Sequence, residues 1–174
     1  MKKHTLRTYL TLLCLAPMGV QSCGYDALYP NPFEQRWPGT IDIAMATAAA
    51  VSSNKIAPLP ILTGGAGLAR SQAWLQTLKS RFKEANLHGG LSILLIDSGL
   101  WSRIRGKESL LLQLHTNGPN PKDRVMLLSE AAINAMLEGA LSIEQGIQLG
   151  IVELPGDDNK QLQRDLHKVL NTEV

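Results

Sequence analysis

The histidines are the first candidates for chemistry in this sequence, and they lie far apart. His88, His115 and His167 form no His-x-x-x-His pair, and no cysteine pair accompanies them. Without closely spaced ligand pairs, a zinc site would need these distant residues to converge in the fold, which the sequence does not show. Residues 157–159 (Asp-Asp-Asn) lack the further ligands of a calcium loop, and helix capping explains them. The sequence therefore predicts no metal site.

Three short motifs imitate catalytic or cofactor-binding ones. Residues 65–70 (GAGLAR) approach a dinucleotide fingerprint, but Arg70 replaces the third glycine and the prolines of residues 58–60 exclude the required strand. Residues 52–55 and 80–83 both match Ser-x-x-Lys, without the companion Lys-Thr-Gly. We therefore predict no cofactor and no catalytic residue. An enzyme would need a polar cluster that the fold gathers from distant positions.

The thiol of Cys23 has the clearest chemical context. Residues 1–8 are basic without a carboxylate, and residues 9–20 are almost wholly apolar. This is the layout of a secretory signal peptide, and the apolar run is shorter than the roughly 20 residues of a membrane-spanning helix. Val20 and Ser22 stand two positions apart before the cysteine, which is the spacing that signal peptidases recognise.

The junction resembles the lipobox of bacterial lipoproteins, with Gln21 bulkier than that pattern usually has. The resemblance implies that residues 1–22 are removed and that Cys23 is acylated, which anchors the chain to a membrane. Gly24 follows the cysteine instead of aspartate, which in this family implies the periplasmic side of the outer membrane rather than the inner one. Cys14 lies in the removed segment, so acylation would occupy the one remaining thiol in an oxidising compartment. The alternative is ordinary secretion with an unmodified cysteine.

Composition describes one foldable domain. About 150 of the 174 residues remain after processing, enough for one domain with a sizeable core. Loss of Lys2, Lys3 and Arg7 leaves 14 basic and 15 acidic side chains, so no nucleic acid partner is implied. A hydrophobic content of 44% excludes a disordered chain.

Residues 23–39 are predicted to be the lipidated cysteine and a tether. Prolines fix extended backbone, so the segment is expected to be a semi-rigid tether. Its aromatic rings either lie at the lipid interface or pack on the domain, and the free energy of burial favours packing. The prolines are Pro30, Pro32 and Pro38, and the aromatic residues are Tyr25, Tyr29, Phe33 and Trp37.

Residues 40–174 are predicted to form a single globular α+β domain. Thr40 caps a helix to residue 50, and residues 56–67 form a loop because of their prolines and glycines. A second helix covers residues 68–85. The strands expected next are 91–96, 100–104, 110–115 and 125–128.

Short connections predict a small antiparallel sheet of about four to five strands packed against helices. Residues 91–96 and 110–112 lack polar alternation, so we expect both faces of their strands to be covered. Further on, Ser129 caps a helix, and residues 142–145 (Ser-Ile-Glu-Gln) form a capping box. Residues 151–154 are extended, and Asp158 caps a last helix.

The order of elements from residue 125 to 170 resembles the C-terminal half of sterol carrier protein type two domains. The resemblance implies an apolar cavity between a curved sheet and helices that holds a lipid-like ligand. The alternative is that the implied lining residues simply fill the core, which the same spacing predicts. These residues are Ile133, Met136, Leu137, Ile147, Leu149 and Ile151.

Three functional hypotheses follow. The first is a non-catalytic, membrane-anchored periplasmic lipoprotein that binds an apolar, lipid-like molecule. The second is an accessory lipoprotein that docks on a periplasmic or outer-membrane protein complex through the tether or a basic helix face formed by Arg70, Lys79, Arg81 and Lys83. Such a face is more often a solvated surface. An enzyme is the third.

Overall fold

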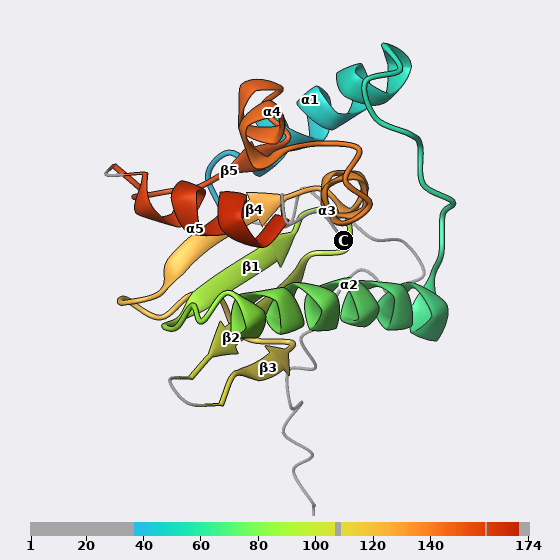
Figure 1. The fold of residues 1–174 in the computed structure, drawn as a ribbon. Coiled ribbons are helices and arrows are strands. Elements are labelled where there is room, and N and C mark those ends of the chain that lie inside the picture. The colour runs from blue at the N-terminus through green and yellow to red at the C-terminus, as the bar shows by residue number, and fades with distance from the viewer. Residues whose placement is uncertain (1–36, 107–108, 159, 171–174) are drawn as a thin grey trace, which may run out of the picture.

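The computed structural model describes residues 37–106, 109–158 and 160–170. The predicted signal peptide, the lipobox with Val20, Ser22 and Cys23, and most of the tether lie outside the described residues. Within the described part, five helices and one five-stranded mixed sheet form an α+β fold (Figure 1). The predicted fold class is confirmed.

The sheet has the strand order β3-β2-β1-β4-β5. Strand β1 pairs antiparallel with β2, and β2 pairs antiparallel with β3, as the short turns predicted. Strand β4 pairs with β1 in parallel, and β5 pairs antiparallel with β4. The strands are β1 (Leu91–Leu95), β2 (Leu100–Arg105), β3 (Leu111–Leu114), β4 (Arg124–Leu128) and β5 (Val152–Glu153).

The position of β4 corrects the expectation that each strand would be the antiparallel neighbour of the one before it. The connection of residues 115–123 carries the chain past β2 and β1, so that β4 joins the far side of β1. Residues 125–128 are all buried, whereas β3 alternates between exposed and half-buried positions. An apolar strand gains more from the interior of the sheet, and β3 is left at the edge.

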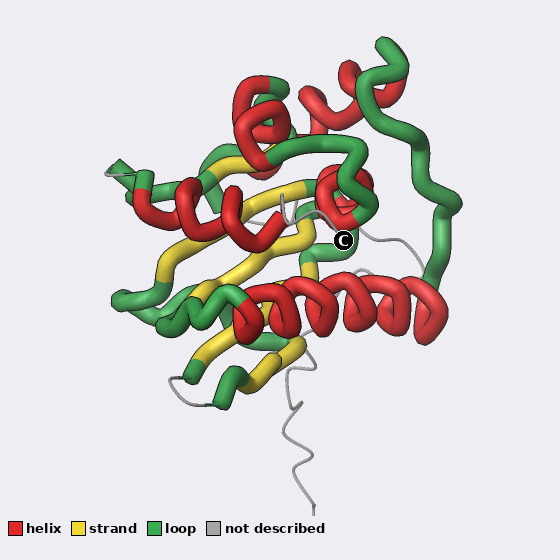
Figure 2. The backbone as a smooth tube through the Cα atoms, viewed as in Figure 1, coloured by secondary structure: helices red, strands yellow, loops and turns green. Residues whose placement is uncertain are grey.

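Both faces of the sheet are covered along β1, whose five residues are all buried. Ile93 and Leu95 belong to the larger core with the helices α2 (Gly64–Glu84), α3 (Glu130–Leu137) and α5 (Gln161–Leu170). Leu94 and Leu127 belong to a second core with Ile43 of α1 (Thr40–Ser52). Figure 2 shows α2 and α5 as two helices across the same face. The prediction of double coverage is confirmed for β1 and wrong for β3, where Leu111 is 54% exposed.

Trp37 is the tether's one aromatic residue within the described range, and it packs on the domain. Its ring meets that of Trp101 edge to face, with the centroids 5.3 Å apart. Both rings pack against the second core. Trp37 therefore packs on the domain, which is the alternative that the free energy of burial favours.

Two helices begin at other residues than predicted. Gly39 is the N-cap of α1, with φ at 89°, and the Thr40 hydroxyl donates to the Trp37 carbonyl instead of capping. Helix α2 begins at Gly64 rather than Leu68. Glycine costs up to about 1 kcal/mol within a helix, and tertiary packing outweighs that cost because Gly67 and Ser71 are buried.

The caps in the C-terminal half follow the sequence closely. Ser129 accepts a hydrogen bond from the Ala132 N–H at the start of α3. Ser142 and Gln145 form the predicted capping box of α4 (Ile143–Gln148). For α5, Asp157 and not Asp158 accepts from the Leu162 and Gln163 N–H groups, at 2.9 Å each. Among the described helices, none has the length and apolar character needed to cross a bilayer.

Candidate functional site

A pocket of about 510 Å³ lies between α1, the α1–α2 connection and the start of α3. Figure 2 shows that connection as a long irregular segment beside the body of the domain. The prolines of residues 58–60 keep it irregular and remove backbone donors. The pocket is lined by Thr47, Ala48, Val51 and Ser52 of α1, residues 58–63, Arg70 of α2, Asp97 and Ser98 of the β1–β2 turn, and Glu130 and Ala131 of α3.

Arg70 connects the walls of this pocket. One guanidinium nitrogen donates to the Pro60 carbonyl at 2.7 Å, and another lies 2.9 Å from the Glu130 carboxylate. The guanidinium also lies over the Trp74 ring, 5.1 Å from its centroid. Through these two contacts, Arg70 holds the α1–α2 connection to α3. Both charged side chains are mostly buried, with 19% of Arg70 and 7% of Glu130 exposed.

Asp97 and Glu130 meet at the N-terminus of α3. The Asp97 carboxylate accepts a hydrogen bond of 2.5 Å from the Glu130 backbone N–H. The first N–H groups of a helix have no partner within the helix, and the helix dipole favours an anion there. The β1–β2 turn therefore supplies a cap for α3 in addition to Ser129.

The pKa of the Asp97 carboxyl is raised above its ordinary value. Burial is the largest cause, and the neighbouring Glu130 carboxylate adds to it, while the Glu130 N–H and the Arg70 guanidinium act in the opposite direction. Asp97 is exposed toward the open pocket, although protein surrounds its carboxyl group on most sides. Protein atoms around a carboxylate displace the water that would stabilise its charge.

Three lining residues hold buried polar atoms that have no hydrogen-bond partner within the described part of the chain. These atoms are the Thr47 Oγ1, the Arg70 Nε and the Ser98 Oγ. Ser98 is only 5% exposed. Buried polar groups without partners are few in folded proteins, so three of them around one pocket make this pocket the candidate place for a ligand that supplies hydrogen bonds.

The arrangement suits a molecule with an apolar body and a small polar end. Val51, Leu59, Ile61 and Leu62 give apolar walls. At the polar end, the charges of Arg70 and Glu130 compensate each other, and Asp97 remains as an acceptor. A hydroxyl or amine on the ligand matches an acceptor of this kind.

Comparison with known proteins gives no family for this chain. No protein-family model matches it, and no curated protein matches it. Among solved structures, the inverting sec-alkylsulfatase Pisa1 from Pseudomonas sp. aligns with 57% of this chain at 17% identity and a TM-score of 0.41. A double mutant of that enzyme aligns with 49% at 18% identity and a TM-score of 0.39.

A third solved structure is a conserved hypothetical protein from Thermus thermophilus, described as a candidate sterol carrier protein. It aligns with 59% of this chain and 84% of its own, at 19% identity and a TM-score of 0.35. The chain spans only about one seventh of the alkylsulfatase, 14% and 13% in the two structures. These are partial structural similarities.

The six residues predicted to line an apolar cavity lie together around the larger core. Ile133, Met136 and Ile151 are at most 1% exposed, and Leu137, Ile147 and Leu149 pack against that core while partly buried. None of the six lines the 510 Å³ pocket. Their role as ligand contacts stays a prediction.

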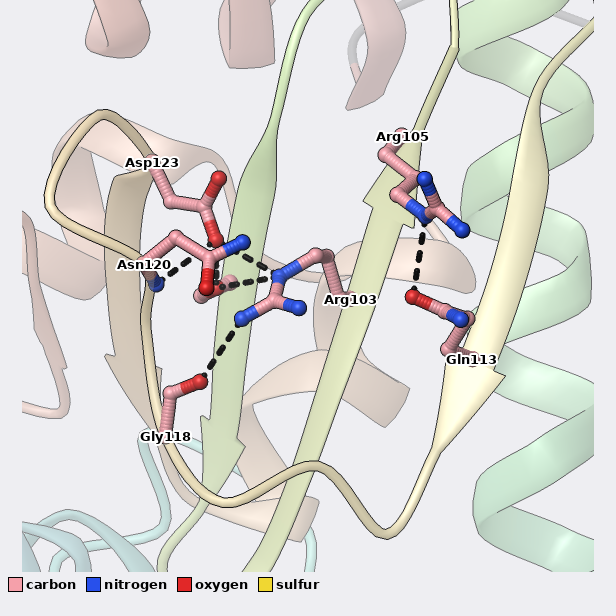
Figure 3. A network of polar contacts seen from close by, with 7 residues as sticks. Arg103, Arg105, Gln113, Gly118, Asn120 and Asp123 are labelled. Carbon is pink, nitrogen blue, oxygen red and sulfur yellow. Dashed lines mark hydrogen bonds and ion pairs between the residues drawn. The ribbon is translucent and has the colours of Figure 1, made fainter.

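A second polar cluster lies on the opposite side of the sheet from the larger core (Figure 3). Arg103 of β2 donates to the Asp123 carboxylate at 2.6 Å and to the Gly118 carbonyl at 2.9 Å. Ser92 and the Asn120 N–H donate to the same carboxylate oxygen, at 2.7 and 3.0 Å. These hydrogen bonds connect the 115–123 crossover to β1 and β2. Both charged groups of the cluster, Arg103 and Asp123, have partners, so we interpret its role as structural.

The remaining sequence candidates are not gathered into a site. His88 contacts Asn86 and His167 contacts Glu144, both at exposed positions. Within the described residues, no group of three or more His, Cys, Asp or Glu side chains could hold a metal ion. Arg70 and Arg81 of the proposed basic face are engaged inside the fold, Arg81 with the Leu137 carbonyl at 3.0 Å.

Sequence reasoning missed the pocket because its polar residues come from three separate elements. In the sequence, Arg70 stands in place of the third glycine of the GAGLAR motif and belongs to a basic helix face. Asp97 was assigned to a turn, and Glu130 follows a capping serine. Asp97 and Glu130 each lie two positions beyond the end of a buried strand, β1 and β4. This spacing could indicate the site only together with the parallel pairing of β1 with β4, which local signals do not predict.

Proposed function

We propose that the mature chain is a periplasmic lipoprotein, anchored through Cys23, whose domain binds a lipid-like molecule in the pocket between α1, residues 58–63 and α3. The observation that carries the proposal is the composition of that pocket. It has apolar walls and one polar end with Arg70, Asp97 and the Ser98 hydroxyl, which has no hydrogen-bond partner among the described residues. Its volume of about 510 Å³ lies within the usual range of ligand pockets. The resemblance of residues 125–170 to sterol carrier protein type two domains implies the same class of ligand.

The proposed role is binding without catalysis. Both carboxylates at the pocket already have structural partners, since Glu130 pairs with Arg70 and Asp97 caps α3. They do converge from distant positions, which is the observation in favour of an enzyme. The two roles differ in outcome, because a carrier releases its ligand unchanged and an enzyme converts it.

Lipid extraction of the natively purified mature protein tests the proposal. Mass spectrometry of the extract is expected to give one apolar molecule, with a hydroxyl or amine, in a stoichiometric amount. Incubation with that molecule should leave it chemically unchanged. An extract without any stoichiometric molecule would favour the accessory lipoprotein that docks on a protein complex.

A matched pair of variants on α1 locates the binding site. Ala48 and Ala49 are neighbouring exposed residues, and only Ala48 lines the pocket. Ala48→Trp fills the pocket and should lower ligand occupancy at least tenfold, whereas Ala49→Trp should leave it unchanged. Equal occupancy in both variants would place the ligand elsewhere.

The anchor is tested separately. Cys23→Ser should abolish labelling by a radioactive or clickable fatty acid and leave the precursor uncleaved by a lipoprotein signal peptidase. Normal processing of that variant would refute the lipid anchor. The same result would not bear on the proposed ligand pocket.

A further inference from the structure

Most of the large exposed apolar side chains lie either at the pocket or on α1, the helix that forms one of its walls. Within the described residues, five such side chains are exposed, and Leu111 on the edge strand β3 is the one that lies away from this region. Ile61 is 92% exposed and Leu62 is 38% exposed, and both line the pocket. The other two are on α1, Ile41 at 52% and Met45 at 68%.

The α1 pair continues the lining of the pocket along the helix surface. Residues three and four apart on a helix are neighbours on one face. Ile41 and Met45 therefore lie in line with Ala48 and Ser52, which form part of the pocket wall. Together with Ile61 and Leu62, they make one apolar rim that begins near the N-terminus of the described domain and ends at the pocket mouth.

The chain outside the described residues indicates what this rim contacts. Thirteen residues, 24–36, separate Cys23 from Trp37, and at about 3.1 Å per residue they reach roughly 40 Å. The segment enters the domain directly before α1, the helix that carries Ile41 and Met45. An acyl chain on Cys23 would keep the domain within roughly 40 Å of the bilayer, with α1 as the helix nearest to the anchor along the chain.

We infer that the apolar rim of Ile41, Met45, Ile61 and Leu62 docks on the lipid bilayer, so that the pocket mouth opens into the membrane surface and the ligand passes between bilayer and pocket without crossing water. The inference rests on the proposed lipid anchor. An exposed apolar patch bordering a ligand groove is typical of such an interaction surface. The partner is a lipid surface rather than a protein.

A fluorescent probe on a single introduced cysteine tests the contact. The mature chain has no other free thiol when Cys23 is acylated, so Ile61→Cys and Met45→Cys can be labelled selectively with an environment-sensitive dye. Leu111→Cys is the matched control, because Leu111 is also an exposed apolar residue but lies on another edge of the domain. The full acylated chain is reconstituted in vesicles of phosphatidylethanolamine and phosphatidylglycerol.

Probes at positions 45 and 61 should shift to shorter emission wavelengths in vesicles and lose several-fold of their quenching by aqueous iodide, while the probe at 111 should change in neither respect. Aqueous emission at 45 and 61 would overturn the inference, and so would an equal shift at 111. A concentration-dependent shift without vesicles would assign the rim to a second copy of the chain and overturn it too. Ligand extraction reports separately on the pocket, so either result can fail while the other holds.

Discussion

The carboxylate of Asp97 lies 2.5 Å from the backbone nitrogen of Glu130, which places two acidic residues from different elements at the start of one helix. Asp97 caps α3 through its oxygen, and the Glu130 carboxylate turns to Arg70. The cap and the ion pair therefore share one corner of the pocket, where charge is costly because water is partly excluded.

Asp97→Asn should change the pH dependence of stability. The pKa of Asp97 is raised in the folded chain from an ordinary value of 3.8, so the folded state binds more protons than the unfolded state just above that pH. Stability contributed by protonated Asp97 is then present below about pH 3.8 and is lost as the pH rises through the raised pKa. Asparagine keeps the accepting oxygen without the charge, so the variant should lack this loss and be at least as stable as the wild type at neutral pH. Thermal unfolding across this pH range measures the difference, and parallel profiles would contradict it.

Arg70→Met should destabilise the fold more than Glu130→Leu. Removal of Arg70 takes away the cation that lies 2.9 Å from the buried Glu130 carboxylate, at a cost of about 3 kcal/mol. Removal of Glu130 leaves Arg70 with the Pro60 carbonyl and relieves the repulsion on Asp97. Chemical denaturation of both variants measures the two free energies of unfolding.

The double variant provides the control for this ion pair. Arg70→Met with Glu130→Leu removes both charges, so it should be more stable than Arg70→Met alone. A double variant as unstable as the sum of the two single ones would show that the charges act independently.

Asp123→Ala should detach the 115–123 crossover. The substitution removes the acceptor of three hydrogen bonds and leaves Arg103, only 13% exposed, without its anion, at a cost of about 3 kcal/mol. Burial raises the pKa of Asp123, but the hydrogen bonds from Ser92, the Asn120 N–H and Arg103 outweigh it, so the net pKa is lowered. Stability from this group is therefore present above pH 3.8 and is lost as the pH falls toward the lowered pKa. Urea unfolding at neutral and acid pH measures both effects.

The exposed pair of His167 and Glu144 is the comparison for that cluster. Its side chains are 54% and 43% exposed, although the two atoms lie 2.8 Å apart. Solvent screens such pairs, so Glu144→Ala should cost less than about 1 kcal/mol. A cost equal to that of Asp123→Ala would mean that burial does not set the difference.

Local signals in the sequence predicted the fold class, the boundaries of most strands and the caps of α3 and α4, because each depends on residues a few positions apart. Ser142 and Gln145 form their capping box without help from the rest of the chain. The parallel pairing of β1 with β4 was not predictable in this way, because it depends on the burial that residues 125–128 gain between two strands. The start of α2 at Gly64 was missed because tertiary packing overrides glycine's low helix propensity.

The pocket was harder to predict than the core. Apolar spacing identified residues such as Ile133, Met136 and Ile151 as buried, and they are. Arg70, Asp97 and Glu130 follow no common spacing, and only the packing of α2 against α3 and the parallel β1–β4 pair bring them together. Contacts between residues 33 and 60 positions apart leave no periodic pattern in one sequence.

Glu153→Gln should stabilise the folded chain at neutral pH. Burial and then the nearby Asp42 carboxylate raise the pKa of Glu153 above its ordinary value of 4.5. Gly39, the N-cap of α1, leaves no room for a side chain beside the Glu153 carboxylate. Because the pKa of Glu153 is raised, the folded state binds the proton of this carboxyl group more tightly than the unfolded state. The free energy of unfolding therefore falls as the pH rises from about 4.5 through the raised pKa. Glutamine removes the repulsion, so the melting temperature of the variant should exceed that of the wild type at pH 7 and approach it near pH 4.5.

Asp158→Asn is the control for this substitution, since Asp158 is an exposed carboxylate that does not cap α5. It removes the same charge from the chain without touching the contact between Glu153 and Asp42. Its melting temperature should therefore follow the wild type across the same pH range. A gain equal to that of Glu153→Gln would attribute the effect to net charge rather than to the contact with Asp42.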